Sequence, residues 1–228
     1  MSKRNIFQKD YPSIIKNSIR FFTDKLVQDK RCIVLEKKTS YHLFPNLSKN
    51  SIVYSGGVGS NIALELELIK KYNSKIFVFD PSPMGEETMS NIKNSNIKFY
   101  PIGLANKSGK KYYEEEYSRK KGNKKKASYK ISLKGDNFFQ CTSISDFFKK
   151  NNHEKIDLLK IDIEGFEYGV LEDIFKNKIP VNQIILEFHG WMKRIPKKLD
   201  KIAKKKLKEE GYKLVYKRND DYTYLKVK

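Results

Sequence analysis

Short apolar runs alternate along the chain with segments whose apolar residues recur at helical spacing. The runs typical of buried strands lie at 51–55, 75–80, 97–103, 156–162 and 181–189. Helices are predicted at 62–72, 85–94, 143–152, 167–177 and 197–210. Ser143 or Ser145 is a candidate N-cap for the third of these helices. Five strands separated by helices predict an α/β fold, a parallel sheet with helices on both faces.

The two ends of the chain extend this pattern. Residues 1–31 form a predicted helix whose apolar stripe includes Ile15, Ile19 and Phe22, and residues 32–50 approach the core irregularly. We therefore treat 1–50 as an N-terminal extension, which could lie on the substrate side of the molecule. At the other end, residues 212–228 alternate around an Asn/Asp turn and predict an antiparallel hairpin.

One segment inside the main domain, 51–228, departs from the alternation. Residues 105–135 are dense in Lys, Gly and Ser, with isolated tyrosines between them. Two weakly alternating stretches suggest a hairpin there. We interpret the segment as a mobile, Lys-rich insertion that could contain such a hairpin.

The charge balance bears on the choice of partner. Lys and Arg number 47 against 27 Asp and Glu, a net charge of +20, and a polyanionic partner such as nucleic acid is one explanation. However, 41 of these cations are Lys and only 6 are Arg, whereas proteins that read phosphates or bases lean on the arginine fork. Compositional bias with a solvated surface is the favoured interpretation, and a nucleic-acid partner stays open.

Several protein classes are excluded by composition. Hydrophobic residues make up 39% of the chain, which is sufficient for a packed core. No apolar run approaches the roughly 18–20 residues that span a bilayer, and no apolar stretch follows the charged N-terminus as in a signal peptide. Cys32 and Cys141 have neither the number nor the spacing of a disulfide scaffold or zinc site. A cytoplasmic protein without a membrane span is expected.

A glycine-rich turn joins the first strand to its helix. It reads Ser55-Gly56-Gly57-Val58-Gly59-Ser60-Asn61, and glycine there lets the backbone approach a ligand closely at a helix N-terminus. Ile62 holds the place of the third glycine in the dinucleotide fingerprint, and no GxxxxGK[ST] motif occurs. These departures argue against NAD and against a P-loop, although a purely structural turn stays possible.

Acidic residues end three of the predicted strands. Asp80 closes the second strand, 21 positions after Gly59, where a carboxylate can accept both hydroxyls of a ribose. Asp162 closes the fourth strand and faces the crevice where open α/β sheets bind ligands. Glu187 and His189 close the fifth strand on the same rim. Glu167 opens the next helix, where interaction with the helix dipole is the favoured explanation.

These motifs together resemble a known family. The segments SIVYSGGVGSNIALELELIKKY, VFDPSP, IDLLKIDIEGFEYGVL and IILEFH, within about 51–190, are similar to FkbM-type methyltransferases. The resemblance implies a Rossmann-like class I methyltransferase fold with a seven-stranded sheet. It also implies S-adenosyl-L-methionine as cofactor, S-adenosyl-L-homocysteine as product, and a sugar or glycan hydroxyl as acceptor.

The resemblance also assigns the cofactor site residue by residue. Gly57 and Gly59 would line the methionine and ribose part, Asp80 would bind the ribose hydroxyls, and Gly103 with Leu104 would lie near the adenine. The remaining residues that we assign to cofactor binding are Ser55, Asn61, Pro81 and Ser82. Family members often carry an acidic residue just after GVG, whereas Ser60 and Asn61 follow here.

The expected chemistry is O-methyl transfer, with His189 or Asp162 taking the hydroxyl proton. Alternatively, Asp162 and Glu187 could hold a divalent metal such as Mg²⁺, because hard cations prefer oxygen ligands. Three other functions stay open: a nucleic-acid methyltransferase or RNA-binding protein that uses the basic surface, a non-catalytic binding protein on the same fold, and a dehydrogenase. The last is disfavoured by the missing third glycine.

Overall fold

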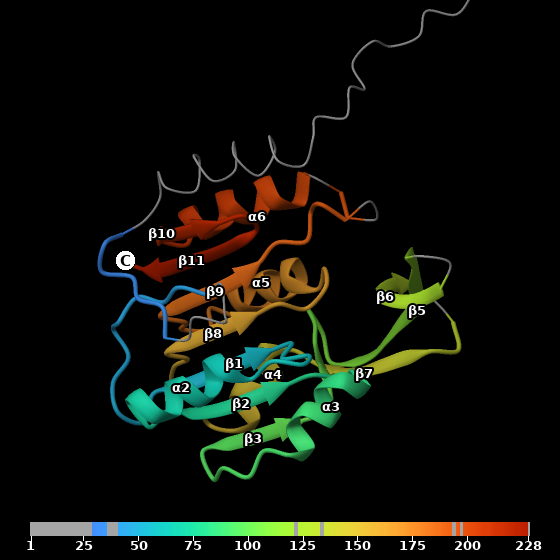
Figure 1. Ribbon diagram of the computed structural model, residues 1–228. Helices are drawn as coiled ribbons and strands as arrows, with labels where there is room; N and C mark the ends of the chain where they lie inside the picture. The colour runs from blue at the N-terminus through green and yellow to red at the C-terminus, as the bar shows by residue number, and fades with distance from the viewer. Residues whose placement is uncertain are drawn as a thin grey trace, which may run out of the picture.

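A seven-stranded sheet forms the centre of the molecule (Figure 1). The computed structural model describes residues 29–35, 41–120, 123–132, 135–192, 195–196 and 198–227. Most of the helix predicted at 1–31 lies outside this range. The order of the strands in the sheet is β10-β11-β9-β8-β1-β2-β3. This order places β8 and β1, which carry two of the candidate motifs, side by side at the middle.

Five strands of the sheet run parallel, as the alternating pattern predicts. They are β1 (Ile52–Gly56), β2 (Lys75–Phe79), β3 (Ile97–Tyr100), β8 (Leu158–Ile161) and β9 (Gln183–Glu187). The terminal hairpin, β10 (Tyr212–Arg218) and β11 (Asp221–Lys226), is antiparallel, and β11 pairs with β9. The predicted fold class, including the antiparallel hairpin, is therefore confirmed.

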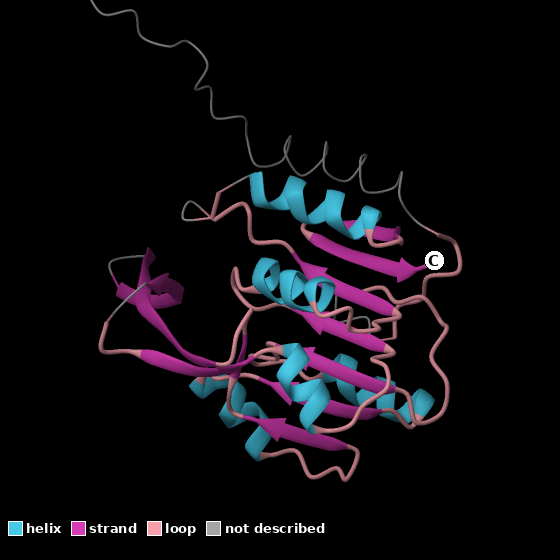
Figure 2. Cartoon of the chain, turned by 180° about the vertical axis from the view of Figure 1, so that it is seen from behind, coloured by secondary structure: helices cyan, strands magenta, loops and turns pink. Residues whose placement is uncertain are grey.

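Helices cover both faces of the sheet (Figure 2). They are α2 (Ala63–Tyr72), α3 (Pro83–Ser90), α4 (Ile144–Lys150), α5 (Glu167–Lys176) and α6 (Lys198–Glu209). Leu64, Leu68 and Met89 of α2 and α3 pack on one face, and α4, α5 and α6 pack on the other. Ser143 is the N-cap of α4, because its hydroxyl accepts the Asp146 amide at 3.1 Å. No helix in the described part of the chain is long and apolar enough to cross a bilayer.

The insertion and the two strands that flank it form a second, smaller sheet in the order β4-β7-β5-β6. Its strands are β4 (Gly103–Leu104), β5 (Gly109–Lys120), β6 (Asn123–Ser132) and β7 (Phe138–Thr142). β5 and β6 make a long antiparallel hairpin that extends away from the main sheet (Figures 1 and 2). The hairpin suggested from sequence is thus present, whereas β7 was not expected. The base of this sheet brings Phe139 and Cys141 to the site described below.

The segment before β1 packs across the α2 face of the main sheet. Leu43 is fully buried, and an isolated bridge pairs it with Ile33. The Gln183 side chain accepts the amide of Phe44 at 2.7 Å and donates to the carbonyl of the same residue at 3.0 Å. These contacts fix the position of Tyr41 at the edge of the site.

Candidate active site

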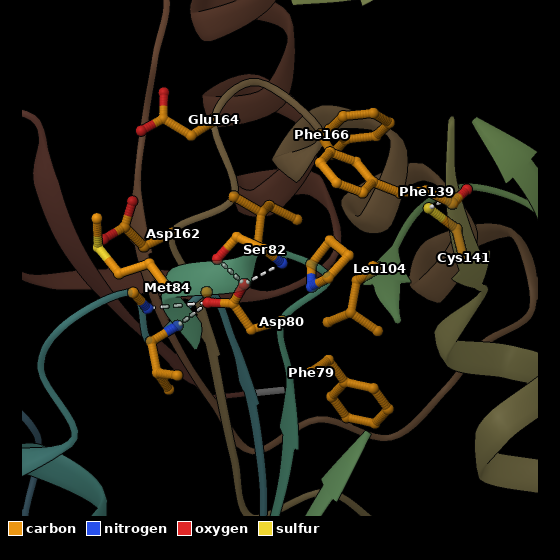
Figure 3. Close-up of a pocket in the computed structure, with 16 residues that line it drawn as sticks. Phe79, Asp80, Ser82, Met84, Leu104, Phe139, Cys141, Asp162, Glu164 and Phe166 are labelled. Carbon is orange, nitrogen blue, oxygen red and sulfur yellow. Dashed lines mark hydrogen bonds between the residues drawn. The ribbon is translucent and has the colours of Figure 1, made fainter. Parts of the chain in front are cut away.

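A pocket of about 390 Å³ opens at the carboxyl ends of the parallel strands (Figure 3). Its lining comes from the turns after β1, β2 and β8 and from the small sheet. Asp162, Glu164 and Met84 lie on one side of Asp80, and the apolar side chains of Leu104, Phe139 and Phe79 lie on the other. The pocket therefore has an acidic side and an apolar side.

The turn after β1 has no space for a side chain at Gly57. Its φ is +77°, and a Cβ there would lie 1.8 Å from the carbonyl oxygen of Asp162. Glycine is consequently required where the β1 and β8 turns meet. Gly57, Val58 and Gly59 of this turn also line the pocket.

Asp80 ties the glycine turn to the start of α3. One oxygen of its carboxylate accepts the amides of Val58 and Gly59 at 2.9 and 2.8 Å. The other oxygen accepts the amide and the hydroxyl of Ser82 at 2.9 and 2.6 Å (Figure 3). Gly85 packs so closely that a Cβ would lie 2.3 Å from the Asp80 Cγ. The carboxylate is therefore held firmly inside the pocket wall.

Most residues assigned to the cofactor from sequence gather around this pocket. Those in its lining are Gly57, Gly59, Asp80, Pro81, Ser82, Gly103 and Leu104. Two others lie outside it. The buried Ser55 hydroxyl donates to Glu65 at 2.5 Å, and the exposed Asn61 side chain accepts the Ala63 amide at 3.0 Å. A cofactor contact through either side chain stays a prediction.

Asp162, which lines the acidic side of the pocket, meets Glu187 and His189 there. Their candidate ligand atoms all lie within 4.8 Å of one another. The Nε2 atom of His189 is 3.6 Å from an oxygen of Asp162 and 3.9 Å from one of Glu187. Both carboxylates are partly exposed, at 28% and 30% of their side-chain surface, whereas His189 is buried. The three strand-end residues identified from sequence are thus brought together.

Glu167 holds His189, one member of this cluster, through hydrogen bonds. It is fully buried, and one of its oxygens accepts the backbone amide of His189 at 2.9 Å and lies 3.2 Å from its Nδ1. The other oxygen accepts the Gly165 amide at 2.8 Å. The helix-dipole explanation favoured from sequence is therefore incomplete, because Glu167 is the ionic partner of His189.

The surroundings of His189 and Glu187 shift the pKa values of both side chains. Burial disfavours the charged form of His189, but the hydrogen bond and charge of Glu167, with Glu164 and Glu187, raise its pKa to about 9. His189 is consequently protonated at neutral pH. Burial raises the pKa of Glu187 to about 7, and the neighbouring charge of Asp162 adds to this effect.

Two further side chains at the site were not identified from sequence. The Tyr41 hydroxyl donates to Asp162 at 2.7 Å, from a segment expected only to be irregular. Lys160 is buried, donates to the carbonyls of Gly56 and Gly57, and lies with its Nζ 5.3 Å from the centre of the Tyr41 ring. Alternation along β8 places Lys160 on the same face as Asp162, a signal that could have indicated it.

Comparison with known proteins assigns the family. No curated protein matches the chain. A fibrillarin pre-rRNA processing protein of Methanococcus jannaschii superposes with a TM-score of 0.45 at 15% identity, covering 82% of this chain and 70% of that one. A rRNA methylase described as putative, from Clostridium thermocellum, gives 0.47 at 8% identity, with coverages of 80% and 89%. At this level neither structure indicates what this chain acts on. Residues 18–214 match the methyltransferase FkbM domain, and the chain therefore belongs to the FkbM family of S-adenosylmethionine-dependent methyltransferases.

Proposed function

We propose that this methyltransferase transfers a methyl group to a hydroxyl of a sugar or glycan. The observation that carries the proposal is the Asp162 carboxylate, which lies at the pocket with 28% of its side chain exposed. One of its oxygens accepts from Tyr41, and the other lies 3.6 Å from the buried His189. A carboxylate held in this way can align an acceptor hydroxyl and receive its proton.

The pocket fits the cofactor of the family. The glycine turn offers backbone without side chains at Gly57, and Asp80 offers carboxylate oxygens beside it. Both oxygens of Asp80 already accept two hydrogen bonds, so a ribose hydroxyl would replace the rotatable Ser82 hydroxyl. Leu104, Phe139 and Phe79 supply an apolar wall suited to an adenine ring.

When bound, S-adenosylmethionine supplies a methyl group on a positively charged sulfur, a good leaving group. The acceptor oxygen would form a bond to the methyl carbon as the carbon–sulfur bond breaks, and the electron pair of that bond would stay on sulfur. The hydroxyl proton passes to the carboxylate of Asp162. The pairing with Glu167 favours the protonated form of His189, which stabilises the charge of Asp162 and makes Asp162 the better acceptor of this proton.

The acidic side of the pocket also bears on the acceptor class. Asp162, Glu164 and Glu187 gather there. Among the described residues of the site, they outnumber the one cation without an acidic partner, the buried Lys160, because the charge of His189 is balanced by the buried Glu167. Such a site repels phosphate groups and favours neutral, hydroxyl-rich acceptors. A sugar is therefore favoured over nucleic acid, even though the whole chain carries a net charge of +20.

A divalent cation such as Mg²⁺ at Asp162 and Glu187 is a second way to align the acceptor. The spacing of the ligand atoms, all within 4.8 Å, supports it. The ion would be held by these two carboxylates and would polarise the acceptor oxygen. Activity that survives thorough EDTA treatment without added metal would exclude this alternative.

The first experiment is calorimetric titration with S-adenosylhomocysteine, using Asp80→Ala and, as a matched control, Glu86→Gln. Glu86 is an exposed acid on α3 outside the pocket lining. We expect affinity to fall at least tenfold for Asp80→Ala and to stay unchanged for Glu86→Gln. Methyl transfer from labelled cofactor is then measured against a panel of glycosides and a short RNA. Methylation of the RNA alone would overturn the proposed acceptor class.

A further inference from the structure

The loop after β9 presents a single large aromatic side chain beside the acidic cluster. Trp191 is the only tryptophan in the chain, and 56% of its surface is exposed. Its ring centre lies 5.9 Å from that of His189, with the planes inclined by 43°. No step of methyl transfer described above uses this side chain.

The exposure of Trp191 does not follow from a loosely packed loop. Phe188 and Met192, on either side of it, are buried, and the amide of Met192 donates to the carbonyl of His189 at 2.9 Å. At Gly190 a Cβ would lie 2.4 Å from an oxygen of Asp200. Residues 188–192 are therefore firmly packed, while the Trp191 ring among them faces solvent. An exposed ring on a packed backbone is available to stack on a ligand.

The surroundings of the ring define what could cover it. The face of an indole ring is electron-rich and attracts groups that carry partial positive charge. A pyranose has a face of polarised C–H groups and an edge of hydroxyls. Asp162 and Glu187 lie 3.6 and 3.9 Å from the Nε2 atom of His189, and their carboxylates can accept hydrogen bonds from such hydroxyls. An aromatic ring and two carboxylates that all neighbour His189 therefore complement both surfaces of a sugar ring.

We propose that Trp191 is the platform on which the acceptor sugar ring stacks, so that one of its hydroxyls reaches Asp162. This inference rests on the proposed sugar O-methyltransferase function and names the residue that selects a ring with an apolar face. Nucleobases also stack on tryptophan. The three carboxylates around the site disfavour the phosphates that would accompany them.

The sole tryptophan provides a direct measurement. With S-adenosylhomocysteine bound, the protein is titrated with methyl α-glycopyranosides, glycerol and a short single-stranded RNA, and the Trp191 emission is recorded. We expect the emission to change with at least one glycoside and to stay constant with glycerol, which lacks a ring face.

Variant kinetics complete the test. For a methylated glycoside, Trp191→Ala should raise KM at least tenfold with kcat within about threefold, and Trp191→Phe should recover part of the loss. Ile202→Ala, at an equally exposed apolar residue of α6 (55%), should change neither parameter.

The outcomes separate this inference from the proposed function. If Trp191→Ala methylates a glycoside with an unchanged KM, the inference is overturned but the proposed function stays intact. An emission change with RNA alone overturns both. If S-adenosylhomocysteine does not bind, the proposed function fails. The glycoside titration of the free protein then decides whether Trp191 binds sugars.

Discussion

At the scale of single residues, Asp162 is held by side chains that arrive from far along the sequence. Tyr41 reaches it from the segment before β1, and His189 reaches it from the end of β9. Asp162, Glu187 and His189 could be identified from their positions at strand ends, because the local pattern of apolar residues predicts where each strand ends. Tyr41 and the pairing of Glu167 with His189 depend on contacts across 121 and 22 residues, which no local pattern encodes.

Removal of the Tyr41 hydroxyl tests its part in positioning Asp162. A hydrogen bond to a carboxylate contributes roughly 1.5–3 kcal/mol, so Tyr41→Phe should lower kcat at least about tenfold. The affinity for S-adenosylhomocysteine should stay unchanged, since Tyr41 is outside the pocket lining. Tyr72→Phe, at a partly buried tyrosine that ends α2, serves as the control. Equal kcat values for the two variants would refute the positioning role.

The His189–Glu167 pair has a pH signature. Because Glu167 raises the pKa of His189 to about 9, the pair stabilises the folded state fully below the ordinary histidine pKa of 6.5. This stabilisation is lost as pH rises from about 6.5 through 9. Urea unfolding between pH 6 and 10 should show the loss, and NMR titration should place the His189 pKa near 9. In Glu167→Gln, the titration should move to lower pH, and an unmoved midpoint would contradict the pairing.

At the scale of elements, the strands, helices and terminal hairpin of the main sheet could be predicted, because the spacing of apolar residues within each segment is typical of its secondary structure. The second sheet was not, since β7 has a mixed burial pattern and pairs with β5 and β4 rather than with the main sheet. Consequently Phe139 and Cys141, which β7 brings to the pocket, were missing from the predicted site. The glycine-rich turn, by contrast, could be recognised from the amino-acid sequence alone.

The contact between the β1 and β8 turns can be tested at Gly57. Gly57→Ala places a methyl group 1.8 Å from the Asp162 carbonyl oxygen at a φ of +77°. We expect a loss of about 2 kcal/mol or more in the free energy of unfolding, and at least tenfold weaker S-adenosylhomocysteine binding. Gly109→Ala also has positive φ but open space around the new methyl group. It should lose only about 1–2 kcal/mol and keep its affinity. Equal effects on binding would mean that the close approach is unimportant.

At the scale of the whole molecule, the net charge of the chain is opposite in sign to the carboxylates that gather at the site. The chain carries +20 overall, yet the pocket presents Asp162 and Glu164, with Glu187 beside them. Net charge therefore says little about the acceptor, whereas the local cluster says more, because screening leaves short-range, partly buried interactions largely intact.

The dependence of kcat/KM on ionic strength distinguishes the effect of the net charge of the chain from the effect of the charges at the site. For a neutral glycoside, kcat/KM should change less than about threefold between 50 and 300 mM NaCl. An acceptor bound through phosphates would instead lose orders of magnitude over a similar range. Steady-state rates at four salt concentrations, with S-adenosylmethionine saturating throughout, decide the point. A steep decline with a neutral glycoside would show that the basic surface takes part.

The strand order has a consequence for synthesis on the ribosome. β11 is made after every other described strand, yet it lies between β9 and β10, with Asp221 opposite Glu187. Until β11 emerges, β10 has no neighbour that joins it to the main sheet, and the strand carrying Glu187 lacks its partner on that side. A nascent chain halted after β10 therefore lacks the strand that pairs with β9 beside Glu187.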